Sequence, residues 1–391
     1  MGADIVGITA EGKSSIINND GKIYLKGDTV TGIDTEKSIS KVVNRGEIFV
    51  ENTAKYQPNG KWVGATGIIV SGVGSEGINE VGGTITVVGD NGRGMEATNG
   101  ATVTNKGTIK VSGNGSFGMV ANGKGSNALN EGTIEIGAVK KGETVGGGMF
   151  AYGGTVTNNG TIIIDSSFNV DENSKNSFAI TASQDEDGNM GVIENYGNIE
   201  TKGNATIKAP NMNAFVIGTN SDGSYGKVSA ENISVDGNVK VSTEIVKGSY
   251  KDSYILDDVM TGKTELKENY KLSTTSVLYG ASSKVDEKGN LDVKLSKENK
   301  FSDFASKEYG SLAGVLDEAL NKKDLSANAK KVLDSVFASS TTEENLRNRL
   351  KEISGVEYTN IARQIFDTKD IFKSYDNSIC LLYTSDAADD K

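Results

Sequence analysis

Short segments in which apolar and polar residues alternate recur along the first half of the chain. The clearest pattern is Asn-x-Gly-Thr-Ile-x-Val/Ile, as in NKGTIKV, NEGTIEI and NNGTIII. Alternation over four to six residues rich in β-branched Thr, Ile and Val indicates a β-strand. The copies recur about every 25 residues or more, which is typical of a repeat architecture. Each copy begins with an asparagine, at Asn19, Asn44, Asn79, Asn105, Asn130, Asn158 and Asn195.

Two further alternating stretches accompany each copy. One directly precedes the asparagine, as in ATVTN and GTVTN, and the other reads GRGMEATN, SFGMVANG or GGGMFAYG. We assign NAFVIGTN, from Asn213, to this last pattern, and we assign a degenerate copy of the main repeat to Asp236. Three strands per period predict a mainly β protein, a right-handed parallel β-helix (β-solenoid). In such a fold, equivalent positions of successive coils stack about 4.8 Å apart.

The alternation also assigns the core. We expect the repeated isoleucines to point inward, where each contributes roughly 1.5–3 kcal/mol of burial free energy; they include Ile109, Ile134 and Ile162. The methionines at 95, 119 and 149 recur at one position of the coil. We therefore expect them to belong to the core and not to bind a cofactor.

The asparagine of each copy is predicted to lie at a corner between two strands. Asparagine tolerates the left-handed backbone conformation, and a glycine two residues later relaxes the chain; these glycines include Gly107, Gly132 and Gly160. Stacked asparagine amides are also expected to hydrogen-bond to the copies above and below.

The repeat fades after about residue 245. We predict repeats over 1–245, the last coils or a β cap over 246–300, an α-helical segment over 301–377, and an unrelated tail over 378–391. In the helical segment, Leu312, Val315 and Leu316 have the spacing of one apolar helix face. A capping box from Thr341 to Glu344 is predicted to begin a later helix.

Composition excludes several kinds of chemistry. The chain has 391 residues, no His, one Cys and a net charge of −11. The absence of His removes the commonest general base and zinc ligand. Without clustered Lys or Arg, nucleic acid is not an expected partner. We predict no catalytic residues, no metal and no cofactor. The start, MGADIVGITAEGKSS, lacks the basic and apolar regions of a signal peptide, so we expect any export signal to lie outside these residues.

The order of the parts resembles the type V autotransporters of Gram-negative bacteria. The NxGTIxV coils look like passengers of that family, and LKEISGVEYTNIARQIF is similar to the stretch that precedes the family's barrel, through Ile353, Ser354, Gly355 and Tyr358. The resemblance implies a surface-exposed or secreted β-helical passenger exported by an outer-membrane β-barrel translocator, which is missing from this chain. Residues 378–391 depart from the family and look like a non-native, adapter-derived read-through.

Few residues suggest local chemistry. Asp185, Glu186 and Asp187 offer oxygen ligands to Ca²⁺, although a solvated loop explains them as well. Polysaccharide-cleaving solenoids use paired carboxylates. The strand glutamates at 96, 135 and 200 are expected to fall at different positions of their coils and to form no pair.

Three functional hypotheses follow. The first is an adhesin or rigid stalk that attaches to a host or bacterial surface receptor, either protein or glycan. The second is a carbohydrate-active β-helix, acting as a polysaccharide lyase or glycoside hydrolase. The third is a toxin-like passenger. The absence of a recognisable catalytic set favours the first.

Overall fold

The computed structural model describes thirteen stretches of the chain, which are residues 4–11, 14–37, 39–53, 64–113, 115–137, 147–164, 178–201, 204–208, 215–229, 232–236, 239–262, 271–321 and 326–355. The chain divides into two compact units. The first contains residues 1–275 and 279–296, and the second contains residues 276–278 and 297–391. The predicted domain boundaries stay predictions.

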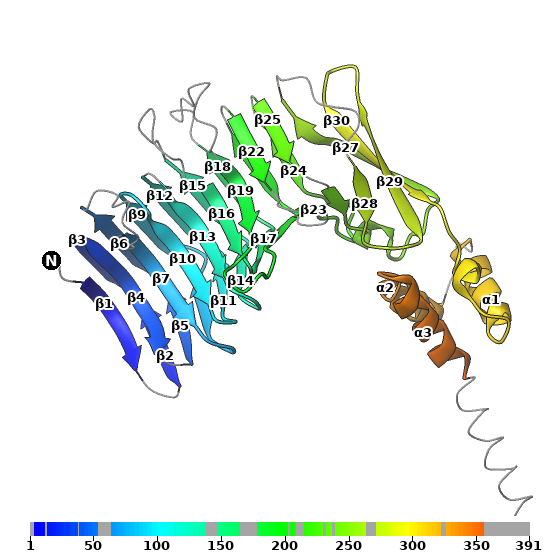
Figure 1. The fold of residues 1–391 in the computed structure, drawn as a ribbon, viewed down its shortest axis with the longest axis horizontal. Helices are drawn as coiled ribbons and strands as arrows, with labels where there is room; N and C mark the ends of the chain where they lie inside the picture. The colour runs from blue at the N-terminus through cyan, green and yellow to red at the C-terminus, as the bar shows by residue number, and fades with distance from the viewer. Residues whose placement is uncertain are drawn as a thin grey trace, which may run out of the picture. The chain divides into compact units, whose positions relative to one another are not determined.

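The first unit is a parallel β-solenoid of nine coils, each of which contributes one strand to each of three sheets. Strands of successive coils lie side by side (Figure 1). The first sheet contains, in order, β1 (Asp4–Glu11), β4 (Thr29–Lys37), β7 (Ala65–Ser71), β10 (Arg93–Thr98), β13 (Phe117–Asn122), β16 (Gly147–Tyr152), β19 (Phe178–Ser183), β22 (Asn204–Lys208) and β25 (Asn232–Asp236).

The other two sheets repeat this order one and two strands further along each coil. The second sheet contains β2 (Ser15–Asn19), β5 (Ser40–Asn44), β8 (Glu76–Asn79), β11 (Thr102–Asn105), β14 (Asn127–Asn130), β17 (Thr155–Asn158), β20 (Val192–Asn195), β23 (Phe215–Ile217), β26 (Val239–Val241) and β28 (Leu272–Thr274). The third contains β3 (Lys22–Gly27), β6 (Glu47–Asn52), β9 (Thr84–Val88), β12 (Thr108–Ser112), β15 (Thr133–Ile136), β18 (Thr161–Ile164), β21 (Asn198–Thr201), β24 (Lys227–Ser229), β27 (Ser253–Thr261), β30 (Leu291–Lys297) and β29 (Tyr279–Val285).

The core consists of side-chain ladders that run through consecutive coils. In the third sheet Ile48, Ile85, Ile109, Ile134 and Ile162 pair in register and are fully buried. In the first sheet the three methionines at 95, 119 and 149 form an equivalent buried ladder. The predicted mainly β solenoid with inward isoleucines and methionines is confirmed.

The last coils differ from the sequence assignment. Phe215–Ile217 forms β23 of the second sheet, where Ile217 pairs with Asn195 of the preceding coil. NAFVIGTN therefore lies on a different sheet from GRGMEATN, which forms a first-sheet strand. Asp236 ends β25 in the first sheet, and the second-sheet strand begins only at Val239. Both assignments were wrong because short apolar alternation fits any of the three faces, and only pairing with the previous coil fixes the register.

In the third sheet the parallel pattern ends at β27. This strand pairs with β24 in parallel on one side and with β30 antiparallel on the other. A short 3₁₀ turn, η1 (Glu244–Val246), lies between β26 and β27.

The second unit contains η2 (Phe301–Phe304), α1 (Gly310–Leu320), α2 (Ala327–Ala338) and α3 (Glu343–Ser354). Its buried side chains include Phe301, Leu316, Leu333, Phe337 and Leu350. No helix of the described residues is long and apolar enough to cross a membrane.

Two helix details differ from the sequence prediction. Val315 is 60% exposed, because α1 buries the narrower stripe of Ala313 and Leu316. The N-cap of α3 is Thr342, whose side chain accepts from the backbone N–H of Asn345 at 3.1 Å. The predicted capping box is therefore displaced by one residue and lacks its acidic partner.

Candidate functional site

The repeat asparagines form one continuous hydrogen-bonded ladder on the second sheet. In each of six steps the side-chain Nδ2 donates to Oδ1 of the asparagine in the next coil, at 2.7–2.8 Å. All members are buried, and together they are Asn19, Asn44, Asn79, Asn105, Asn130, Asn158 and Asn195. The ladder ends at Ile217, which leaves Asn195 Nδ2 as the one buried side-chain nitrogen or oxygen atom without a partner among the described residues. The asparagine ladder therefore joins successive coils.

The glycines of the repeat are required for a different reason from the expected backbone conformation. Neither the ladder asparagines nor Gly107, Gly132 and Gly160 have a positive φ. Instead, a Cβ added at Gly107 would lie 2.2 Å from the backbone oxygen of Gly83 in the preceding coil, and one at Gly132 would lie 2.2 Å from that of Gly107. Gly160 is equally close to Gly132, at 2.1 Å. Glycine is required because backbones of adjacent coils touch at this corner.

The residues that carry the autotransporter resemblance lie at the end of α3. Ile353 and Ser354 are in its last turn, and Gly355 has φ of 71° at the C-cap. A left-handed glycine at this place is the usual way to end a helix. Tyr358 lies outside the described residues.

The acidic loop at 185–187 is a tight turn closed by an antiparallel bridge between Gln184 and Met190. Asp185 Oδ1 accepts from the backbone N–H of Asp187 at 3.1 Å and of Asn189 at 2.8 Å, and the Asn189 side chain binds both carboxylate oxygens. The side-chain hydrogen bond from Asn189 is the main reason that the pKa of Asp185 is lowered. The same Asp-x-x-Gly-Asn turn recurs at Asp286.

We expect Asp185→Ala to open this turn without unfolding the solenoid. Because the folded-state pKa lies below the usual 3.8, the carboxylate stabilises the turn above that value, and this contribution is lost as pH falls through the lowered pKa. Amide hydrogen exchange at residues 187 and 189 should be faster in the variant. Asp187→Ala is the control, because the Asp187 carboxylate makes no hydrogen bond with another described residue. Equal exchange in both variants would contradict the assignment.

Three other carboxylates approach one another. Asp258, Asp286 and Asp292 each offer an oxygen within 4.8 Å of the others, and all three are half-buried. Such oxygens are suitable ligands for a hard cation. However, Asp258 Oδ1 accepts from Asn290 Nδ2, and Asp292 Oδ1 accepts from the Asp258 backbone N–H, both at 2.8 Å. These hydrogen bonds explain why the three carboxylates lie close together, because they tie the residues to the paired strands β27 and β30.

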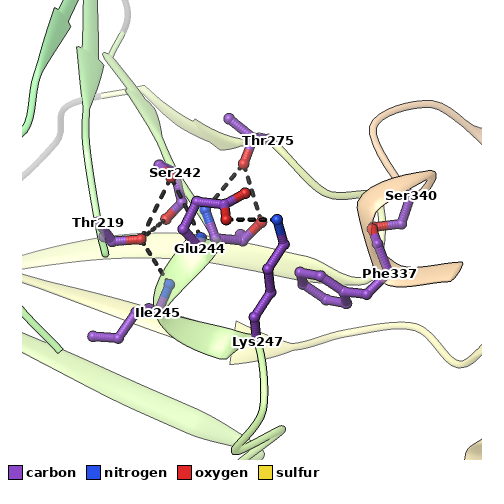
Figure 2. Close-up of polar contacts among 9 residues, drawn as sticks. Thr219, Ser242, Glu244, Ile245, Lys247, Thr275, Phe337 and Ser340 are labelled. Atoms are coloured by element: carbon purple, nitrogen blue, oxygen red, sulfur yellow. Dashed lines mark hydrogen bonds and ion pairs between the residues drawn. The ribbon is translucent and has the colours of Figure 1, made fainter. Parts of the chain in front are cut away.

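A hydroxyl cluster joins the last coils, beside the row that continues the asparagine ladder as Ile217, Val241 and Thr274 (Figure 2). Thr219 Oγ1 donates to the Ser242 backbone oxygen at 2.9 Å and accepts from the Ile245 N–H at 3.0 Å. The Thr275 hydroxyl accepts from the Thr243 N–H at 3.0 Å, and Glu244 pairs with Lys247 nearby. Among the described residues these hydroxyls bind backbone groups and one another, and the nearby Glu244 carboxylate pairs with Lys247 and not with a hydroxyl. This is not the arrangement of an activated nucleophile.

A further candidate site is a groove on the outer face of the third sheet, with a volume of about 610 Å³. One outward residue from each of six consecutive coils lies along it, in the paired order Thr86, Lys110, Glu135, Ile163, Glu200 and Ser229. The remaining lining residues lie at or beside the strand ends and are Val87, Val111, Ser112, Ile136, Gly137 and Ile164.

Charge is unevenly distributed in this groove. Lys110 Nζ forms an ion pair with Glu135 Oε2 at 2.9 Å, and both side chains are about half exposed. Glu200 is exposed and forms no ion pair or hydrogen bond with another described residue. Ile163, which lies between the two glutamates, is 37% exposed. The groove therefore combines one carboxylate that has no partner among the described residues, an ion pair and an accessible apolar side chain.

The expectation that the strand glutamates fall at different coil positions was wrong for two of them. Glu135 and Glu200 occupy the same row two coils apart, a backbone separation of about 9.6 Å. Each of the two lies five residues after a repeat asparagine, Asn130 or Asn195, so alignment of the copies held the signal that was missed. Glu96 does lie elsewhere, on the first sheet, where its buried carboxylate pairs with Arg93 and accepts from Asn122 Nδ2 at 3.1 Å.

Comparison with known proteins finds similarity to one surface-exposed protein and to two of its domain families. Residues 1–117 match the family described as BigA third pectate lyase-like domain, and residues 214–299 match the BigA beta sandwich domain. The chain is 27% identical over 387 residues to a Salmonella typhimurium (strain LT2) protein provisionally named surface-exposed virulence protein BigA. The match covers 90% of this chain but only 18% of that relative. No solved structure matches the chain.

Proposed function

We propose that the chain is part of a surface adhesin, in which a rigid solenoid carries an attachment groove on its third sheet. The groove across six coils is the observation that supports attachment most directly. The similarity to a surface-exposed protein supports the location. We further propose that it is a type V autotransporter passenger at the cell surface, bound to the outer membrane or secreted, with a host or bacterial receptor as its partner.

Rigidity comes from bonds between coils. Beside the asparagine ladder, exposed ion pairs join neighbouring coils, among them Lys22–Glu47 at 2.8 Å, Lys26–Glu51 at 2.7 Å and Lys41–Glu76 at 3.3 Å. Each exposed pair contributes only about 0–1 kcal/mol, so its main effect is to favour one register. Nine coils at about 4.8 Å give a spacer of about 38 Å.

Attachment is tested with beads coated with the purified chain and added to epithelial cells and to bacterial cells. We expect saturable binding to at least one cell type, and competition by the soluble chain. Beads coated with an unrelated protein of similar net charge are the control. Binding that never exceeds this control on any cell type would remove the adhesin role and leave only the spacer.

A second candidate, a carbohydrate-active enzyme, is favoured by one observation. Glu135 and Glu200 face one groove at a backbone separation of about 9.6 Å, and the two carboxyl groups of inverting glycoside hydrolases are roughly 6.5–9.5 Å apart. Release of new chain ends from a polysaccharide would support this candidate, whereas binding without cleavage would exclude it. A toxin-like passenger has no described residue in its favour.

A further inference from the structure

The shape of the third-sheet groove suits a linear polymer that runs along the solenoid. Its outward row passes from Thr86 to Ser229 through six consecutive coils, so it extends about 24 Å across the strands. A ligand lying in this direction would meet one new side chain about every 4.8 Å. A small molecule would fill only part of it.

The backbone around the groove excludes an added peptide strand. Every strand that contributes to the row, from β9 to β24, is paired on both sides within its sheet. Its N–H and C=O groups are therefore already used, and recognition by β-strand addition requires a free sheet edge. Only side chains are left to recognise the ligand.

The side chains of the groove match the chemistry of a sugar. Glu200 offers a free carboxylate, which forms strong charge-assisted bonds with hydroxyl donors. The hydroxyls of Thr86, Ser112 and Ser229 both donate and accept. Ile163 provides an exposed apolar surface between the two glutamates for the C–H face of a ring.

The charge of the groove selects against acidic polymers. Its charged lining residues in the described part of the chain are Lys110, Glu135 and Glu200, and within that set the Lys110–Glu135 ion pair leaves one uncompensated negative charge. The whole chain adds a net charge of −11. A polyuronate or sulfated glycan would meet repulsion in this field, whereas a neutral glycan would not.

We propose that this groove binds a linear neutral glycan lying along the solenoid axis, with Glu200 accepting hydrogen bonds from its hydroxyl groups. The proposal rests on the adhesin function and names the class of its ligand. It separates this groove from a site for an anionic polysaccharide.

The test is calorimetric titration of the purified chain with hexasaccharides of four neutral types: β-1,4-glucan, β-1,3-glucan, α-1,4-glucan and β-1,4-linked N-acetylglucosamine. We expect at least one to bind, more tightly than its disaccharide because the longer ligand spans more coils. Hexagalacturonate should bind at least tenfold more weakly. Glu200→Gln should weaken binding of the neutral hexamer about tenfold, the loss expected for one charge-assisted bond.

Glu194→Gln is the matched control, because Glu194 is in the same coil but on the second sheet, where it accepts from the Thr157 hydroxyl at 3.2 Å. It should bind the hexamer as the parent chain does. Failure of all four neutral hexamers, preference for hexagalacturonate, or equal losses in both variants would overturn the proposal. Cell binding that is unaffected by Glu200→Gln, with no hexamer bound, would refute the glycan site while leaving the adhesin role intact. Hexamer binding without cell binding would refute the adhesin role and leave the glycan site intact.

Discussion

Replacing Asn105 with Ala is expected to lower the free energy of unfolding of the central coils by about 3 kcal/mol. The Asn105 amide donates to Asn130 Oδ1 at 2.8 Å and to the Thr133 backbone oxygen at 3.2 Å, and its own oxygen accepts from Asn79 at 2.8 Å. The residue is fully buried, so no water replaces these partners. Each buried polar group left without a partner costs about 1–3 kcal/mol.

The effect is measured by thermal denaturation together with hydrogen exchange of the coil amides, because a repeat array does not unfold strictly in two states. Thr104→Ala is the matched control, since Thr104 is the preceding residue on the same strand and its side chain is half exposed on the outer face. We expect it to change stability by less than about 0.5 kcal/mol. Equal destabilisation by the two variants would show that the ladder contributes nothing specific.

Gly107→Ala is expected to be at least as damaging, for a steric reason. The new Cβ would lie 2.2 Å from the Gly83 backbone oxygen and 2.6 Å from that of Glu80. Both atoms belong to the backbone of the preceding coil, so the two coils must separate and weaken their sheet hydrogen bonds. Overpacking of this kind costs about 3 kcal/mol. A fall in melting temperature, with faster amide exchange in the two adjoining coils, is the expected result.

Gly21→Ala provides the control for this prediction within the same chain. Gly21 follows Asn19 as Gly107 follows Asn105, but a Cβ added there meets no atom within 4 Å. The substitution should therefore change stability by less than about 0.5 kcal/mol. Equal destabilisation at both positions would mean that the glycine acts through backbone conformation and not through the contact between coils.

Much of the solenoid could be predicted from the sequence, because its strands are nearly identical copies. The period identified the coil, and the alternation identified inward residues such as Ile109 and Met95, both fully buried. The prediction failed where the copies lack the repeat asparagine. Ile217 occupies an asparagine position, and no local feature of FVI indicates which of the three sheets it joins.

The candidate site could be predicted much less well. Glu135 and Glu200 each lie five residues after a repeat asparagine, so the repeat places them in one row, but it does not indicate that this row lines a groove. The role of the glycines was also invisible in the sequence. A close approach to the Gly83 oxygen and a left-handed turn both require glycine, and only the coordinates distinguish them.

The sequence by itself determined the fold class, the inward face of each strand and the chemistry that the chain lacks, because these depend on residue type and periodicity alone. The tertiary structure decided which row of outward residues lines a groove. That arrangement depends on how each coil pairs with the next, and the pairing brings Lys110, Glu135 and Glu200 into one groove. Stacking converts a one-dimensional repeat into a surface, and the surface carries whatever function is local.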